Sequence, residues 1–192
     1  PAIPVEVLRA VSKIRAVLPP FAVLATLILA LMMILTCSAM AELTFTTGGD
    51  QGTYYGFGTV LAGQISDKTD TTVTAIVGKG SKANIEAMDA GDAQLGFCQS
   101  DVMAYAYNGT STFADVGKVS DFSTVANLYM EQVQIVTCDP SIKTVADLKG
   151  KKVSVGDSGS GVEFNAQQIL GAYGITFDDI NKQNFSSQAS AD

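Results

Sequence analysis

A strand, a glycine-containing loop and the start of a helix follow one another in residues 44–57, TFTTGGDQGTYYGF. The β-branched and aromatic residues at the beginning favour a strand, which stops at Gly48 and Gly49. Polar residues 50–53 follow, and an apolar pattern typical of a helix then begins. Glycine lets the backbone approach a ligand, and the unpaired N–H groups of a first helical turn favour negative charge. The stretch therefore predicts a binding site for a small anion rather than a catalytic centre.

The rest of the chain alternates between strand and helix patterns. We expect strands at residues 43–47, 72–77, 93–98, 122–130, 132–137 and 152–155. We expect helices at residues 54–67, 81–90, 101–107, 145–148 and 161–173, helix starts at 178–180 and 187–192, and a loop at 108–121. This alternation predicts βαβ units in an α/β fold with a parallel sheet. Ligands of such sheets bind beyond the carboxyl ends of the strands, where polar loops 47–53, 78–81, 99–101 and 156–161 are expected.

Residues 1–41 have the pattern of a secretory signal peptide. Arg9, Lys13 and Arg15 precede an uncharged run of 15 residues, 21–35, and Ala39-Met40-Ala41 forms a small-x-small cleavage site. The run is short for a membrane span, which needs about 20 residues. We therefore expect a cleaved leader outside the fold, with an uncleaved anchor as the alternative. Thr36 before Cys37 argues against lipid attachment at that cysteine.

Composition excludes several classes of function. Residues 42–192 contain nine basic and eighteen acidic residues, a net charge of −9, which argues against nucleic acid and anionic lipid as partners. The chain has no histidine, which is the most frequent general base and metal ligand. Because no ligand cluster has metal-site spacing, we expect neither a metal nor a cofactor. Cys98 and Cys138 lie in expected buried strands, where free thiols are favoured over a disulfide.

Two short motifs imitate enzyme signatures. Gly156-Asp157-Ser158-Gly159 matches the nucleophile segment of trypsin-like proteases, but those enzymes need a histidine and a β-barrel. We interpret it as a polar loop that caps the following helix. Residues 78–83, GKGSKA, superficially resemble a dinucleotide fingerprint. A secreted protein has little access to such a cofactor, so a helix capped by Ser81, or one whose start faces a ligand, is preferred. The chain is accordingly not expected to be an enzyme.

Several of these segments together resemble one family of receptors. Thr46-Thr47-Gly48-Gly49 followed by Gly52-Thr53-Tyr54-Tyr55 is similar to the opening of the solute-binding subunits of TAXI-type TRAP transporters. Further matches follow in order: Gly80-Ser81 with Asn84, Gln99-Ser100-Asp101, residues 145–156 and residues 158–161. The last two are widespread in type II periplasmic binding proteins and are less specific. The resemblance covers residues 42–192.

The resemblance implies a type II periplasmic-binding-protein-like fold with two α/β lobes, each a helix-flanked sheet. The first lobe would comprise residues 42–130, and residues 131–192 would form the hinge and the start of a second lobe that is incomplete here. Such a receptor captures a small organic anion outside the cytoplasmic membrane of a bacterium or archaeon, in the periplasm or at the cell surface. It delivers the anion, here glutamate, glutamine or a dicarboxylate, to membrane permease subunits that an ion gradient drives.

Carried over by position, the resemblance implies a ligand shell of Gly49, Thr53, Tyr54, Tyr55, Ser81, Asn84, Gln99, Ser100, Ser158 and Ser160. Adjacent helical residues point about 100° apart, so only one of the two tyrosines can face the cleft while the other packs. The only arginines are Arg9 and Arg15, so a carboxylate would be held by N–H groups, hydroxyls and helix N-termini.

Two other functions stay open from the sequence. A secreted hydrolase would require a catalytic base with a route to a nucleophile, and the acid pair Asp178-Asp179 lies at a helix start, where solvated charge is ordinary. A ligand-sensing lobe of a larger receptor would require a long hydrophobic segment beyond residue 192.

We predict that the leader is cleaved after Ala41, because the small-x-small site follows the uncharged run directly. N-terminal sequencing of the secreted protein should begin at Glu42. A mature chain that begins at a lipidated Cys37 would contradict the prediction.

Overall fold

The computed structural model describes residues 41–191, and the residues from Glu42 onward group as one compact unit. The predicted leader lies outside the described residues, except for Ala41, at which the first strand begins. Within residues 41–191, no helix combines the length and the apolar character that crossing a membrane requires.

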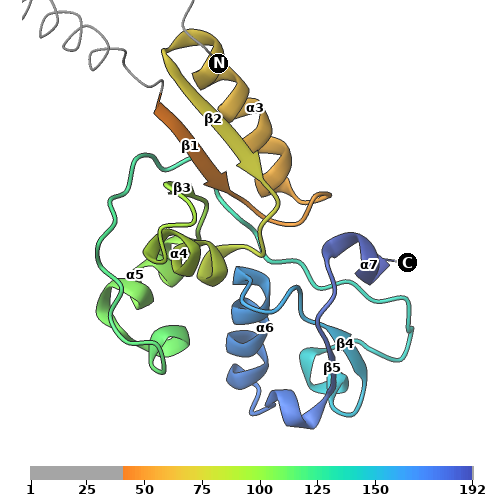
Figure 1. Ribbon diagram of the computed structural model, residues 1–192. Coiled ribbons are helices and arrows are strands. Elements are labelled where there is room, and N and C mark those ends of the chain that lie inside the picture. The colour runs from red at the N-terminus through yellow and green to blue at the C-terminus, as the bar shows by residue number, and fades with distance from the viewer. Residues whose placement is uncertain (1–40, 192) are drawn as a thin grey trace, which may run out of the picture. The chain divides into compact units, whose positions relative to one another are not determined.

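The first part of the fold confirms the α/β prediction (Figure 1). Its elements are β1 (Ala41–Thr46), α3 (Thr53–Lys68), β2 (Thr71–Ile76), α4 (Ser81–Asp89), β3 (Leu95–Gly96), α5 (Ser100–Asn108) and the 3-10 turn η1 (Ser111–Phe113). The strands form a sheet in the order β2-β1-β3. β1 and β3 are parallel, with Phe45 opposite Leu95, and β1 and β2 run in the same direction in Figure 1. The carboxyl ends of the three strands therefore lie at one edge of the sheet, as expected.

Backbone hydrogen bonds tie the loops together at this edge. Gly78 N donates to Gly48 O at 3.0 Å, and Gly80 N donates to Thr47 O at 3.2 Å. The Thr47 hydroxyl, which is fully buried, donates to Ile76 O at 2.6 Å. The loop after β2 is thereby fixed to the end of β1.

The side chain of Asn84 joins α4 to the same edge from inside. Its amide oxygen accepts a hydrogen bond from the Thr46 hydroxyl at 2.9 Å, and its amide nitrogen donates to Phe97 O at 2.8 Å. Asn84 is only 1% exposed, so these groups are out of reach of water. Burying a carboxamide is tolerable because both of its ends find partners.

The second part of the fold is a smaller α/β arrangement. Its elements are the 3-10 turn η2 (Val145–Leu148), β4 (Lys152–Ser154), α6 (Gly161–Ala172), the 3-10 turn η3 (Phe177–Asp179), β5 (Asn181–Gln183) and α7 (Ser187–Ala191). β4 and β5 pair in parallel, with Lys152 opposite Asn181. Capping boxes that Thr144 forms with Asp147, and Thr176 with Asp179, start the two 3-10 turns. The helices expected at 145–148 and 178–180 are therefore single 3-10 turns.

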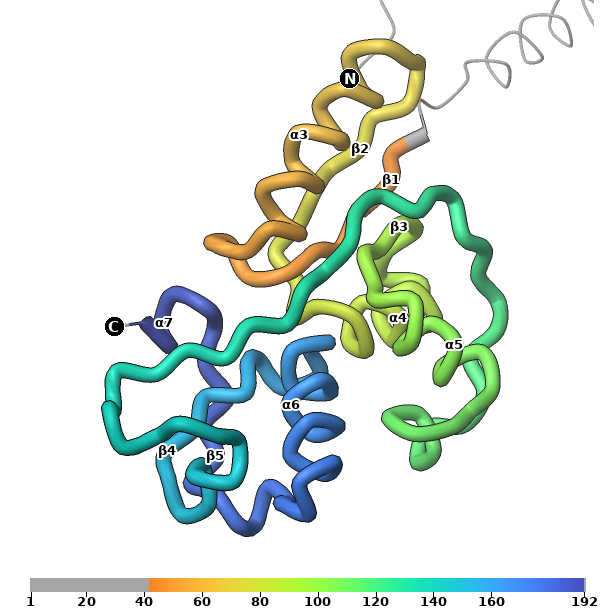
Figure 2. Tube along the Cα trace, turned by 180° about the vertical axis from the view of Figure 1, so that it is seen from behind, coloured from red at the N-terminus to blue at the C-terminus, as the bar shows by residue number. Residues whose placement is uncertain are grey.

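The two strands expected at residues 122–130 and 132–137 are wrong. Residues 122–137, which we call the crossing segment, contain no strand, although Figure 2 shows them extended as they run from α5 past β3 and β1 towards β4. No strand of the described residues pairs with the crossing segment, so its β-forming side chains have no ladder to join. Many of them are exposed, among them Met130 at 85% and Val136 at 88%.

The environment predicted for the cysteines also needs correction. Both thiols are free, as favoured, but neither lies in a buried strand: Cys98 is partly buried and Cys138 is exposed. Cys98 follows the short strand β3, which ends at Gly96 rather than at residue 98. Burial raises the pKa of the Cys98 thiol to about 11, so it is protonated at neutral pH.

Replacing Asn84 by alanine should destabilise the fold strongly. The change leaves the Thr46 hydroxyl and the Phe97 carbonyl buried without partners, at a cost of about 1–3 kcal/mol for each group. Urea unfolding measures the loss of free energy. Asn108→Ala is the control, because Asn108 makes one exposed hydrogen bond to Ala104 O within α5. Equal midpoints for the two variants would contradict the prediction.

Candidate functional site

The N-terminus of α3 lacks a side-chain cap. Gly52 occupies the N-cap position, and the first turn of the helix contains no acidic residue. The turn before it is closed by a 2.8 Å hydrogen bond from Gly52 N to Gly49 O. Thr53 is exposed at the first helical position. The N–H groups of this first turn and the positive end of the helix dipole can therefore receive an anion.

Tyr54 packs inward from the same turn. Its ring stacks on Phe97 with centroids 4.9 Å apart, and its hydroxyl lies near Ser81 and Glu131. Burial raises the pKa of Tyr54, Glu131 raises it further, and the contact with Ser81 opposes both. The phenol is thus a neutral group that links α3 to α4 and to the crossing segment. Tyr55, the neighbour of Tyr54, is half-buried.

Ser81 connects the starts of α4 and α5. It is 1% exposed, and its hydroxyl oxygen accepts a hydrogen bond from Gln99 N at 3.0 Å. The side-chain oxygen of Gln99 is buried and has no hydrogen-bond partner among the described residues. A buried carbonyl oxygen without a donor is uncommon, so the Gln99 side chain provides an unused hydrogen-bond acceptor at this edge.

The loop of residues 156–161 packs directly on these groups. Gly159 O accepts hydrogen bonds from Lys82 N at 3.1 Å and from Ala83 N at 3.3 Å, both in the first turn of α4. The Cα of Gly161 lies against the side chains of Gln99 and Ser81, so close that a methyl group at residue 161 would overlap the Gln99 amide. We call this contact of Ser81, Gln99 and Gly161 the junction.

The junction brings several predicted ligand residues together. Tyr54, Ser81, Gln99 and Ser160 meet there, since Ser160 lies beside Gly80. Gly49 lies beside the carboxylate of Asp157. Thr53, Ser100 and Ser158 are exposed. Asn84 is enclosed on the inner side of α4.

Ser160 and Glu163 occupy the start of α6. The Ser160 hydroxyl oxygen accepts from Glu163 N at 3.1 Å and so caps the helix, while the Glu163 carboxylate accepts from Gly159 N at 2.8 Å. Sequence reasoning missed Glu163, although Ser160-x-x-Glu163 has the spacing of a capping box. It also missed Glu131 and Asp157, whose places beside Tyr54 and Gly49 follow from the tertiary path of the chain.

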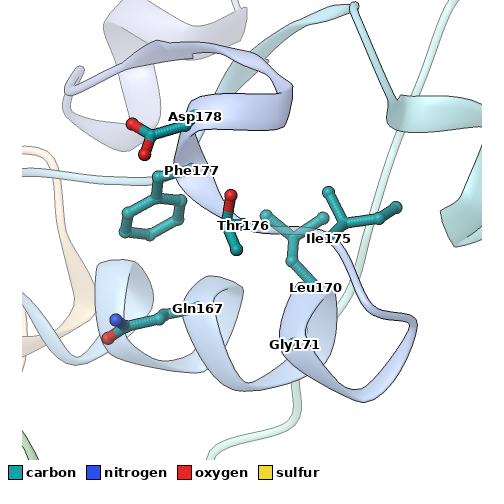
Figure 3. A pocket seen from close by; sticks show the side chains of 7 residues that line it. All are labelled: Gln167, Leu170, Gly171, Ile175, Thr176, Phe177 and Asp178. Carbon is teal, nitrogen blue, oxygen red and sulfur yellow. The ribbon is translucent and has the colours of Figure 1, made fainter.

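One pocket lies at the other end of α6 (Figure 3). Its volume is about 390 Å³, and it is lined by Gln167, Leu170, Gly171, Ile175, Thr176, Phe177 and Asp178. The Thr176 hydroxyl is already bonded to Asp179 at 3.1 Å, and the remaining lining is largely apolar. The pocket contains none of the predicted ligand residues and offers an anion few donors, so we place the candidate site at the edge around α3 and the junction. Residues 41–191 also contain no group of three metal-ligating side chains.

Comparison with known proteins identifies a family and, among solved structures, a similar fold. The sequence model of the NMT1-like family matches residues 45–192. The fold is similar to that of the alkanesulfonate-binding protein SsuA from Xanthomonas axonopodis pv. citri bound to MOPS, with 21% sequence identity and a TM-score of 0.47. The match covers 79% of this chain and 50% of that one, so the chain spans about half the length of that protein.

Gly161→Ala should weaken the junction. The added methyl group overlaps the Gln99 amide and would lie 2.8 Å from Ser81 Oγ, so the loop or Gln99 must move, at a cost of about 1–3 kcal/mol. Gly171→Ala in the same helix is the matched control, because a methyl group there meets no atom within 4 Å. It should stabilise the protein by about 0.5–1 kcal/mol. Urea unfolding of both variants tests this, and shifts of the same sign would contradict it.

Proposed function

Because the chain belongs to the NMT1-like family, whose members resemble periplasmic binding proteins, we propose that it is an extracytoplasmic solute receptor that captures a small organic anion. The receptor serves an ion-gradient-driven permease of the TAXI type of TRAP transporter. The family match is the observation that carries the receptor assignment. The motif of residues 46–55 supports its finer form, and the α/β arrangement of the described residues agrees with a solute receptor in general.

The anion binds at the N-terminus of α3 in this proposal. Support comes from comparing this helix start with the others around the edge. The first turn of α4 already donates to Gly159 O, the start of α6 is capped by Ser160 and carries Glu163, and α5 has Asp101 in its first turn. The start of α3 has neither a side-chain cap nor an acid, so its positive end is the best placed of the four to attract a carboxylate.

The ligand shell combines this helix start with nearby polar groups. Thr53 and the first-turn N–H groups of α3 bind the carboxylate, and the side chains of Tyr54 or Tyr55, Ser81, Gln99 and Ser100 line the same edge. Gly49 lets the solute approach the backbone. Ser158 and Ser160 contribute from loop 156–161 when it closes about a hinge at residues 130–134. We expect this set of N–H groups and hydroxyls to bind glutamate, glutamine or a dicarboxylate.

Calorimetry on the full-length protein tests the proposal with glutamate, glutamine and succinate. Thr53→Ala and Ser158→Ala should each lower the affinity about tenfold or more, because a hydrogen bond to a charged ligand is worth about 1.5–3 kcal/mol. Thr59→Ala is the matched control. Thr59 is exposed nearly two turns further along α3, and its hydroxyl donates to Tyr55 O at 2.8 Å, away from the helix start.

Wild-type affinity in both Thr53→Ala and Ser158→Ala would show that the anion is held elsewhere. Failure of the wild-type protein to bind any of the three solutes would contradict the proposed solute class.

A further inference from the structure

Glu163, in α6, joins loop 156–161 to β5 and to Asn184 just after that strand. Its Oε1 atom accepts from Lys182 Nζ at 2.7 Å and from Asn184 Nδ2 at 3.0 Å, and its Oε2 atom accepts from Gly159 N at 2.8 Å. Lys182 lies in β5, Asn184 follows that strand, and Gly159 lies in loop 156–161. Both carboxylate oxygens are therefore engaged, which fixes the orientation of the group.

The environment makes this an effective anchor. The Glu163 side chain is 17% exposed and that of Lys182 is 31% exposed, so the ion pair is partly shielded from solvent. Burial alone would raise the pKa of Glu163, but the hydrogen bonds from Lys182, Gly159 and Asn184 outweigh it and lower the pKa. The carboxylate is thus charged when it holds Gly159, and charged acceptors make the stronger hydrogen bonds.

Gly159 carries the effect of this anchor to the first part of the fold. Its φ of +81° lies in the left-handed region, which a glycine adopts without strain. While Gly159 N is held by Glu163, Gly159 O accepts from Lys82 N and Ala83 N. The carbonyl oxygen fills the place at the start of α4 where an anion's oxygen would bind.

We propose that Glu163 is a positioning residue that sets loop 156–161 against the first turn of α4. It thereby closes the first-turn N–H groups of Lys82 and Ala83 to solute and defines how Ser158 and Ser160 face the edge. The effect on solute binding rests on the proposed function, whereas the docking of the loop does not.

Residue-resolved amide hydrogen exchange on the full chain tests the docking without any solute. In Glu163→Gln one side-chain oxygen is replaced by an amide nitrogen, so residue 163 cannot accept from both Gly159 and Lys182. Exchange at Lys82 and Ala83 should become about fivefold faster, as expected for about 1 kcal/mol of lost hydrogen bonding. The amide of Asn84, which donates to Gly80 O at 2.8 Å in the same helix, should keep its wild-type rate.

Asp139→Asn is the matched control variant. Asp139 is a carboxylate in the same part of the chain that pairs with Lys151 at 3.0 Å, but it does not touch loop 156–161. This variant should leave exchange at Lys82 and Ala83 unchanged. Wild-type protection of Lys82 and Ala83 in Glu163→Gln would overturn the proposal. A uniform rise over all amides would also overturn it, because it would mean that Glu163 only stabilises the protein.

Calorimetry then separates this inference from the proposed function. If the wild-type protein binds glutamate, Glu163→Gln should change the affinity for glutamate at least threefold, whereas Asp139→Asn should not change it. Equal affinity in the wild type and both variants would limit Glu163 to docking of the loop and overturn its role in solute binding. If wild type binds no solute, the proposed function fails, and the exchange rates still decide whether Glu163 positions the loop.

Discussion

The buried carboxamide of Asn84 is the interaction on which the edge of the first sheet depends. It holds the Thr46 hydroxyl at the end of β1 and the Phe97 carbonyl just after β3. Ser81 lies three residues earlier on the same helix, so the orientation that Asn84 imposes on α4 also determines where the Ser81 hydroxyl meets Gln99 N. The buried Asn84 side chain, which no ligand reaches, thereby fixes the position of the Ser81 hydroxyl at the junction.

Hydrogen-bond satisfaction distinguishes the helix starts around this edge. α4 is satisfied by a carbonyl from loop 156–161, and α6 by its own Ser160 and Glu163. α3 and α4 both have glycine at the N-cap position and no acid in the first turn, but only the start of α4 is met by the Gly159 carbonyl. The polarity of the edge is therefore set by which helix starts already have an acceptor.

Local patterns predicted the helices well, because amphipathic spacing is a property of short windows, although Gly80 and not the expected Ser81 occupies the N-cap position of α4. The helix expected at 54–67 is α3 (Thr53–Lys68), and the one expected at 161–173 is α6 (Gly161–Ala172). Strands depend on partners elsewhere in the chain. The crossing segment has strong β-formers and no partner strand among the described residues, whereas β5 (Asn181–Gln183) lacks β-formers and pairs with β4.

The same distinction applies to the site. Ser81 and Gln99 could be placed at helix starts from sequence, because loop positions follow from the order of elements. The approach of Glu131 to Tyr54 and of Asp157 to Gly49 could not, because it depends on the route of the chain between the two parts of the fold. Nor could sequence separate Asn84, which faces inward, from the neighbouring polar residues of α4.

Glu131 has a second consequence through its place in the crossing segment. It is the only charged residue among residues 122–137, and it separates the run FSTVANLYM from the run QVQIVT. Uncharged windows rich in β-formers stack readily with copies of themselves, and a charge between them interrupts that association. A neutral substitution at residue 131 would thus remove the acid beside Tyr54 and also join the two uncharged runs into one longer aggregation-prone segment. Such a variant is therefore expected to be less soluble, and this effect is separate from any change in its affinity for solute.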